Sequence, residues 1–240
     1  MERETAYIID EMNKLGISLT EQQSEQLYEY YRLLVEWNSF MNLTGITEFS
    51  EVVQKHFVDS LSIVKVKNMN DVDNLIDVGT GAGFPGLPLK IVFPHLKVTL
   101  LDSLNKRIDF LNAVIEKTGL TGIETIHGRA EDFARNEKYR EQYDMVVSRA
   151  VANLAVLSEY CIPYVKMDGY FIPYKSGEIE DELNESKKAI KILGGKTQKV
   201  VQFELPDTDI ARSLVIIKKE KSTGMKYPRK SGIPSRKPLH

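Results

Sequence analysis

The chain has 240 residues, of which 42% are hydrophobic and 28% are charged, and its net charge is −2. This length can bury a sizeable core in one domain, and the composition is typical of a globular protein. No stretch approaches the ~18 apolar residues that a membrane helix needs, and the first residues form no apolar signal segment. We therefore expect a cytoplasmic protein without membrane contact.

The cysteine and histidine content argues against a disulfide and against a metal site. Cys161 is the single cysteine and has apolar neighbours, so we expect a packed core residue. The four histidines lack the spacing of metal ligands, and each is expected to be structural or solvated. They are His56, His95, His127 and His240. For Trp37 and His56, a place in the core is favoured over a catalytic role.

Helical spacing dominates the first 68 residues. Thr20 and Gln23 form a capping box at the start of one expected helix, whose apolar face is Leu27, Tyr31, Leu34 and Val35. A second helix is predicted from the spacing of Val53, Phe57, Leu61 and Val64. We interpret residues 1–68 as a small helical cap over one side of a ligand cleft.

The most informative motif lies at residues 75–84, where a short apolar run ends in Gly79, Gly81 and Gly83. Glycine lets the backbone approach a ligand closely. A second apolar run ends in Asp102, where a carboxylate about 20 residues beyond the loop can accept hydrogen bonds from both ribose hydroxyls. The pattern predicts a nucleoside site, although an ordinary glycine-rich turn remains the alternative.

The details of this loop favour S-adenosylmethionine over a dinucleotide. The third glycine comes one residue earlier than in Gly-x-Gly-x-x-Gly, Phe84-Pro85 follows it, and no phosphate-binding lysine is present. Asp77 adds negative charge that would repel a pyrophosphate but suit a cation. S-adenosylmethionine carries a sulfonium and an ammonium group and has no phosphate.

Strands and helices alternate from residue 69 to residue 220, which we interpret as the core domain. Five strands are expected at 74–78, 97–101, 123–127, 143–148 and 169–174, and a helix at 178–193 is followed by two runs, 199–205 and 213–218, that pair antiparallel. The fold class is therefore α/β, with a mostly parallel, doubly wound sheet of seven strands.

Two loops at the carboxyl ends of later strands are expected to complete the site. Residues 128–132 can face the adenine edge, although Glu131 or Asp132 can instead cap a helix. Arg149 follows the fourth strand. Methyltransferases usually place the residues that bind the methyl acceptor after this strand. No Asn/Asp-Pro-Pro-aromatic turn and no activated cysteine is present, so an acceptor without a proton to lose, such as guanine N7, is favoured. Arg149 and Lys175 can bind guanine O6 or phosphates, or can be surface charges.

Residues 221–240 hold six basic and no acidic side chains among prolines and glycines. We expect a flexible tail that contacts nucleic-acid phosphates, with Arg229 and Lys230 among the contacts and Tyr227 able to stack on a base. The alternative is a solubilising tail.

Several blocks together resemble the bacterial 16S ribosomal RNA guanine-N7 methyltransferase family, also called glucose-inhibited division protein B. The resemblance spans nearly the whole chain. The matching blocks are residues 35–38, 41–44, 55–60, 77–86, 101–103, 128–131, 148–150 and 226–230.

The resemblance implies a Rossmann-like methyltransferase fold, S-adenosylmethionine as methyl donor, and N7 methylation of a 16S rRNA guanine, conventionally position 527, in naked RNA or the small subunit. It places Gly79, Phe84, Ala130, Glu131 and Arg149 at the cofactor, and residues 173–177 depart from the family pattern. No catalytic residue is assigned, and we expect a monomer. The alternatives are a methyltransferase for another acceptor, a non-catalytic protein that binds cofactor and RNA, and, less favoured, a nicotinamide dehydrogenase.

Overall fold

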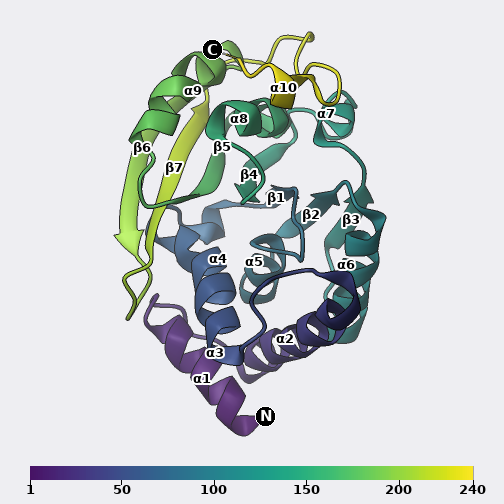
Figure 1. Cartoon of the computed structure of the whole chain (residues 1–240), viewed down its shortest axis with the longest axis vertical. Coiled ribbons are helices and arrows are strands. Elements are labelled where there is room, and N and C mark those ends of the chain that lie inside the picture. Colours follow the sequence, from purple (N-terminus) through teal and green to yellow (C-terminus); the bar gives the residue numbers. More distant parts are fainter. Residues whose placement is uncertain (240) are drawn as a thin grey trace.

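Seven strands form one sheet in the order β3-β2-β1-β4-β5-β7-β6 in the computed structural model (Figure 1). The structure describes residues 1–239, so the expectation for His240 lies outside the described residues. Five neighbouring strands are parallel: β1 (Asn74–Val78), β2 (Lys97–Asp102), β3 (Ile123–His127), β4 (Tyr143–Arg149) and β5 (Val165–Ser176). β7 (Ala211–Lys219) pairs antiparallel with β5 and with β6 (Gly195–Glu204). The predicted α/β sheet is confirmed.

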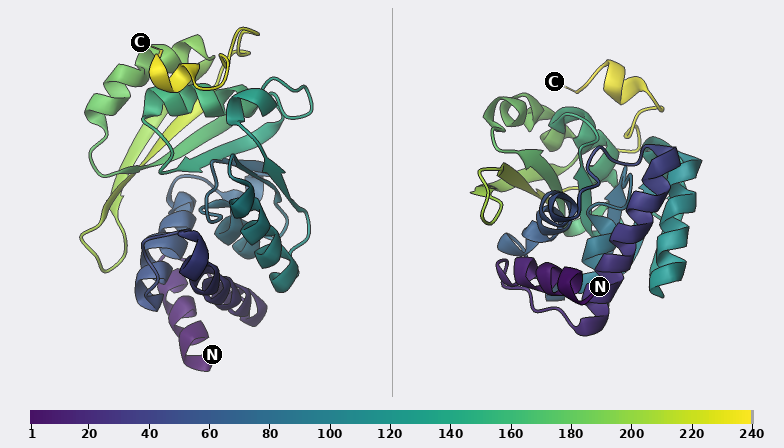
Figure 2. Two further views of the ribbon diagram at one scale, coloured as in Figure 1. Left: turned by 45° about the vertical axis from the view of Figure 1, so that its right-hand side comes forward. Right: turned by 60° about the horizontal axis from the view of Figure 1, so that its bottom comes forward.

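The helices lie in two layers, one on each side of the sheet (Figure 2). One layer holds α1 (Glu2–Asn13), α2 (Glu21–Met41), α3 (Phe49–Val52), α4 (Asp59–Leu61), α5 (Gly86–Val92) and α6 (Asn105–Thr118). The other holds α7 (Ala130–Phe133), α8 (Leu154–Cys161), α9 (Glu180–Ile192) and α10 (Ile233–Arg236). Three short 3₁₀ helices lie between these elements: η2 (Ser62–Lys65), η3 (Met69–Asp71) and η4 (Ile162–Tyr164). No helix within residues 1–239 is long and apolar enough to cross a membrane.

Alternate residues of each central strand enter two separate cores. Leu75 and Leu100 pack against the first layer, whereas Ile76 and Leu101 pack against the second. Because both faces of the sheet are covered, the central strands read as continuous apolar runs. Cys161 lies in the second core and is fully buried, which confirms its expected place and raises the pKa of its thiol.

The predicted capping box is present at the start of α2, where the Thr20 hydroxyl accepts from Gln23 N at 3.2 Å and Gln23 Oε1 accepts from Thr20 N at 2.9 Å. The buried face of α2 centres on Leu27, Tyr30 and Leu34. Tyr31 and Val35 lie at the border of this face and are only half-buried. The N-terminal helices share one continuous core with α5 and α6.

The second predicted helix is interrupted by a π-helical segment, η1 (Val53–Val58), between α3 and α4. A π-helix holds extra residues per turn, and such segments are frequent at functional sites. Here it carries Lys55 and His56 to the carboxyl edge of the sheet, beside the pocket described below.

The C-terminal residues differ from the expected flexible tail. We call residues 223–239 the C-terminal strap, and its Tyr227 and Pro228 are buried. Arg140 donates to the carbonyl oxygens of Thr223 at 2.6 Å and Tyr227 at 2.9 Å. The prediction of a flexible tail is wrong for the described residues because buried polar groups of the core hold this segment. Tyr227, buried in this way, presents no ring for a base to stack on.

Candidate functional site

The glycine loop after β1 has the backbone geometry that its sequence predicts. Gly79, Gly81 and Gly83 all have positive φ, at 72°, 62° and 98°. A Cβ at Gly81 would meet nothing within 4 Å, so this residue faces open space. A Cβ at Gly79 would lie 2.6 Å from Val151 Cγ2, because the loop after β4 packs onto the glycine loop. The loop therefore leaves room for a ligand at Gly81.

Asp77 points under the glycine loop rather than toward a ligand. Its Oδ2 accepts hydrogen bonds from Thr80 Oγ1 at 2.7 Å and Gly86 N at 2.9 Å, while Oδ1 is buried without a partner among the described residues. Burial raises the pKa of Asp77 to about 6, although Thr80 and Gly86 act in the opposite direction. Asp77 thus braces the loop from below.

Asp102 ends β2 with its carboxylate beside the glycine loop. Its Oδ2 accepts from Gly81 N at 2.9 Å and from Arg107 Nη1 at 3.1 Å, and its Oδ1 accepts from Leu104 N at 2.9 Å. Each carboxylate oxygen can accept more than one hydrogen bond. The geometry that ties Asp102 to the loop also leaves it able to bind a ribose.

One cavity of about 780 Å³ connects the residues that the sequence singled out. This volume lies within the range of small-ligand pockets. Gly79, Gly81, Phe84, Asp102, Ala130, Glu131, Arg149 and Lys175 all line it. Arg229 and Lys230 do not.

At one end of the pocket, Glu131 in α7 lies beside Ala130 and Tyr160. Its Oε1 accepts a hydrogen bond from Gly232 N in the strap at 3.0 Å. Glu131 therefore joins the pocket wall to the strap.

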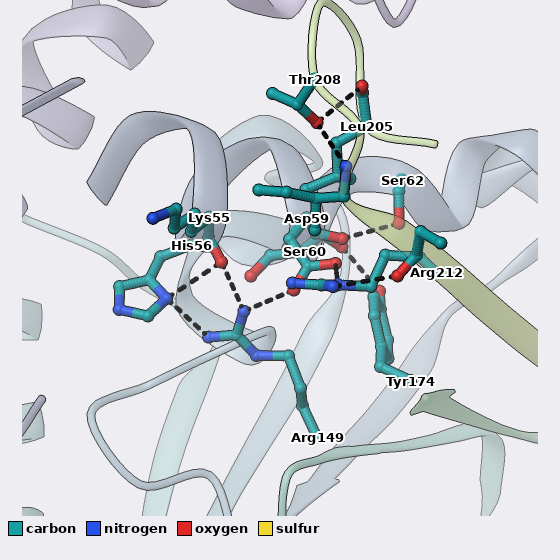
Figure 3. Close-up of polar contacts among 12 residues, drawn as sticks. Lys55, His56, Asp59, Ser60, Ser62, Arg149, Tyr174, Leu205, Thr208 and Arg212 are labelled. Carbon is teal, nitrogen blue, oxygen red and sulfur yellow. Dashed lines mark hydrogen bonds and ion pairs between the residues drawn. The ribbon is translucent and has the colours of Figure 1, made fainter. Parts of the chain in front are cut away.

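At the other end of the pocket, Arg149 binds residues of the N-terminal helical layer (Figure 3). Its Nη1 donates to Asp59 Oδ2 at 2.8 Å and to the Lys55 carbonyl oxygen at 2.9 Å. Its guanidinium carbon lies 5.1 Å from the centre of the Phe84 ring. Asp59, only 2% exposed, also accepts from Arg212 Nε at 3.0 Å. Two arginines thus share one buried carboxylate and leave a net positive charge.

His56 belongs to this cluster, so the expectation of a plain core residue is wrong. Its ring stacks on Phe84 with the centroids 4.5 Å apart, its Nε2 lies 3.0 Å from Thr44 Oγ1, and its Nδ1 lies 3.2 Å from Arg149 Nη2. Burial, with Arg149 adding to it, lowers the pKa of His56 to about 4, and the ring is neutral at pH 7. The signal in the sequence was a histidine and an aspartate, His56 and Asp59, three residues apart in an apolar helical pattern.

Lys175 lines the pocket but its ammonium group is engaged. Lys175 Nζ lies 2.5 Å from Glu182 Oε1 and donates to the Ala152 carbonyl oxygen at 2.8 Å. Glu182 Oε1 also accepts from Leu154 N. The two side chains hold the loop of residues 150–153 in place, and Glu182 was not singled out from the sequence.

The two predicted tail contacts behave differently. Arg229 donates to both oxygens of Glu159, from Nη2 at 2.6 Å and from Nε at 2.9 Å, whereas Lys230 is exposed. Arg229 is therefore committed to the interior of the protein. No group of three or more His, Cys, Asp or Glu side chains in the described part of the chain is arranged to hold a metal ion.

Comparisons with known proteins identify the family that this chain is similar to. The model of the family described as rRNA small subunit methyltransferase G (GidB) matches residues 23–213. The relatives with the name "Ribosomal RNA small subunit methyltransferase G" include proteins from two bacteria. One, from Lachnoclostridium phytofermentans, is 55% identical over 99% of this chain and 98% of its own. The other, from Desulforamulus reducens, is 53% identical over 94% of each chain.

Solved structures support the fold. Pyrococcus horikoshii TYW2, solved in complex with MeSAdo, has a TM-score of 0.54 and 13% identity, over 70% of this chain and 63% of its own. A methyltransferase chain from a Haloferax volcanii complex with the activator Trm112 has a TM-score of 0.58 and 13% identity, over 78% of this chain and 98% of that chain. At 13% identity, this similarity supports the Rossmann-like fold alone.

Proposed function

The chain belongs to the rRNA small subunit methyltransferase G family, and on that premise we propose that it transfers a methyl group from S-adenosylmethionine to N7 of a guanine in 16S rRNA, at the position conventionally numbered 527. The observation that carries this proposal is that one pocket joins the glycine loop and Asp102 to the Arg149–His56 cluster. One end suits a nucleoside cofactor and the other suits a polar base.

The glycine loop, Asp102, Ala130 and Glu131 form the cofactor end. The open space at Gly81 admits a ligand against the backbone, Asp102 accepts from the ribose hydroxyls, and the start of α7 meets the adenine. S-adenosylmethionine bound here supplies an electrophilic methyl group on a sulfonium. Phe84 lies between this end and the Arg149–His56 cluster, in contact with both side chains.

The Arg149–His56 cluster forms the acceptor end, which needs no general base. Guanine N7 has a lone pair and no proton, so the chain has only to align the base with the methyl group and exclude water. The N7–carbon bond forms as the sulfur–carbon bond breaks, and the positive charge passes from sulfur to the base. Because His56 is neutral, it adds no further positive charge at the acceptor end.

Arg149 is placed to orient the guanine. Both Nη1 hydrogens bind Lys55 and Asp59 and Nη2 lies 3.2 Å from His56 Nδ1, whereas Nε forms no hydrogen bond within the described residues and remains available as a donor. Guanine O6 is the acceptor next to N7, so a donor to O6 alone positions N7 while leaving it free to react. Arg149 therefore serves the acceptor end in this proposal, whereas the family resemblance places it at the cofactor.

We infer further that the chain acts as a monomer in the cytoplasm. The place of action follows from the proposed substrate, the 16S rRNA of the small ribosomal subunit.

The test is methylation of small subunits from cells that lack this activity. With labelled S-adenosylmethionine, we expect label at one guanine, mapped as N7-methylguanine by chemical cleavage of the RNA. An Arg149→Met variant should bind the subunits but transfer methyl at least tenfold more slowly. Absence of transfer by the wild-type protein to both subunits and free 16S rRNA would contradict the proposal.

A further inference from the structure

The C-terminal strap is anchored to the domain by buried groups. Arg229 forms its two-pronged contact with Glu159, which is 1% exposed in its side chain. Arg140, itself buried, donates to three strap carbonyl oxygens, and Arg135 Nη2 donates to that of Pro228 at 2.6 Å. These contacts fix the first half of the strap.

The second half of the strap meets the cofactor end of the pocket. Gly232 N donates to Glu131, a pocket residue. Tyr160, which also lines the pocket, lies beside Ser235 and Arg129; burial raises the pKa of its hydroxyl, and these two neighbours oppose the change. The strap therefore lies beside α7, next to the cofactor end of the pocket (Figures 1 and 2).

This surface, which we call the strap face, is strongly basic. It consists of the exposed side chains of residues 129–138 and of the strap. The exposed cations are Arg129, Arg135, Lys138, Lys226, Lys230, Arg236 and Lys237, and the exposed carboxylates are Asp132 and Glu137. Within residues 1–239, Arg229 is the one basic side chain of these two segments that forms an ion pair. The strap face therefore presents a cluster of cations without carboxylate partners.

The anchors give these cations fixed positions. A free tail would lose conformational entropy on binding a polyanion, whereas a docked strap has already lost it in folding. Ammonium and guanidinium groups held on one segment suit the phosphate groups of a nucleic-acid backbone.

We propose that the strap face binds the phosphate backbone of the substrate RNA beside the cofactor end of the pocket, as a second contact separate from the acceptor end. The inference rests on the proposed function. It divides the tail cations into an anchor, Arg229, and RNA contacts, which include Lys230. The strap face thereby sets the affinity and orientation of the RNA without touching the reacting base.

The test compares charge reversals at two ends of the molecule. In Lys226→Glu/Lys230→Glu, two exposed cations of the strap face are reversed while Arg229 and Glu159 are kept. The control, Arg3→Glu/Lys117→Glu, changes the net charge equally on α1 and α6, away from the strap in Figure 1. Binding to 16S rRNA and to small subunits lacking the methyl group is measured from 0.05 to 0.3 M salt, about the range over which counterion release is visible.

We expect the strap variant to bind RNA at least tenfold more weakly at the lowest salt. The slope of log affinity against log salt should become shallower by about 1.5, since each lost phosphate contact removes about 0.7 to 0.9. S-adenosylmethionine affinity should stay unchanged, and the control should match the wild type in all respects.

An unchanged affinity and slope in the strap variant would overturn the inference and leave these cations as a solvated surface. If the strap variant binds RNA as the wild type does and still methylates it, the proposed function remains intact. Failure of the wild-type protein to methylate RNA would contradict that function separately. Weaker binding to subunits with unchanged binding to free RNA would also overturn the inference, because it would assign the strap face to a ribosomal protein.

Discussion

The carboxylate of Asp77 lies fully buried beneath the glycine loop, where one oxygen holds Thr80 and Gly86 and the other has no partner in the part of the chain described. A buried carboxylate is costly in its charged form. Its raised pKa, about 6, makes this cost depend on pH.

Asp77→Asn should therefore change the pH dependence of stability. The folded pKa of about 6 lies above the ordinary value of 3.8, so the native state holds more protons between these values, and the free energy of unfolding falls as pH rises through this window. Asparagine keeps an acceptor for Thr80 and Gly86 but carries no charge. Relative to wild type, the variant should gain up to about 3 kcal/mol between pH 4 and pH 7. Urea unfolding at several pH values measures the difference; a gap constant with pH would contradict the buried charge.

Gly81→Val should abolish cofactor binding by filling the open space where the loop meets the ligand. A matched control exists in Gly119, at the end of α6, whose φ is +66° against +62° for Gly81 and whose Cβ would also meet nothing within 4 Å. Both valine variants impose similar backbone strain, of order 1–3 kcal/mol. Calorimetry should show a loss of S-adenosylmethionine affinity of at least a hundredfold for Gly81→Val alone; equal affinities would place the cofactor elsewhere.

The glycine loop and Asp102 were predictable because each depends on short-range spacing at the end of a strand. The direction of the Asp77 side chain was not, since it depends on the backbone amide of Gly86 turning back toward β1. For the same reason His56 was assigned to the core, although it reaches the pocket through a π-helical turn that apolar spacing does not reveal.

At the scale of elements, the alternation of strands and helices was predictable because buried parallel strands form apolar runs of characteristic length. The bounds of some elements were not predictable. β5 begins at Val165 rather than at residue 169, because Val165 already pairs with Tyr143, and a register shift that leaves extra residues in β5 separates this pair from the next, Met145 with Tyr170. That pairing depends on a strand distant in sequence.

The loop of residues 150–153, between β4 and α8, is held by Lys175 of β5 and Glu182 of α9. We interpret these two as positioning residues for the loop beside Arg149. Glu182→Gln keeps an acceptor for Leu154 N but weakens the tie to Lys175. We expect kcat to fall roughly tenfold, the cost of one charge-assisted hydrogen bond, with little change in S-adenosylmethionine affinity.

The matched control for this variant is Glu185→Gln, an exposed residue of the same helix. Steady-state kinetics on small subunits separates kcat from KM. A rise in KM for RNA with constant kcat would instead make Lys175 a direct RNA contact, as its sequence position first suggested.

At the scale of the whole molecule, the carboxyl edge of the sheet gathers the functional groups, and the two layers of helices close the pocket from opposite sides. Open α/β sheets bind ligands at this edge, so the location was predictable. The docked strap was not, because its anchors are distant in sequence: Arg229 meets Glu159, 70 residues away, and Gly232 meets Glu131, 101 residues away.

We expect the ion pair between Arg229 and Glu159 to be the main interaction that holds the strap on the domain. Arg229→Met would leave a buried carboxylate without its partner and should lower the free energy of unfolding by about 2–3 kcal/mol. Lys230→Met, at the adjacent exposed position, should cost less than about 0.5 kcal/mol. Adding Glu159→Gln to Arg229→Met should recover part of the loss, because the unpaired charge is removed.

Two measurements follow the strap directly. Denaturant unfolding gives the stability of the four proteins, and limited trypsin digestion reports how often the strap leaves the domain, since its lysines and arginines are protected only in part while docked. Arg229→Met should be cut within residues 226–236 faster than wild type or Lys230→Met. Equal cutting rates and equal stabilities would mean that the carbonyl contacts of Arg140 hold the strap without the ion pair, and Arg229 would then become available to the strap face.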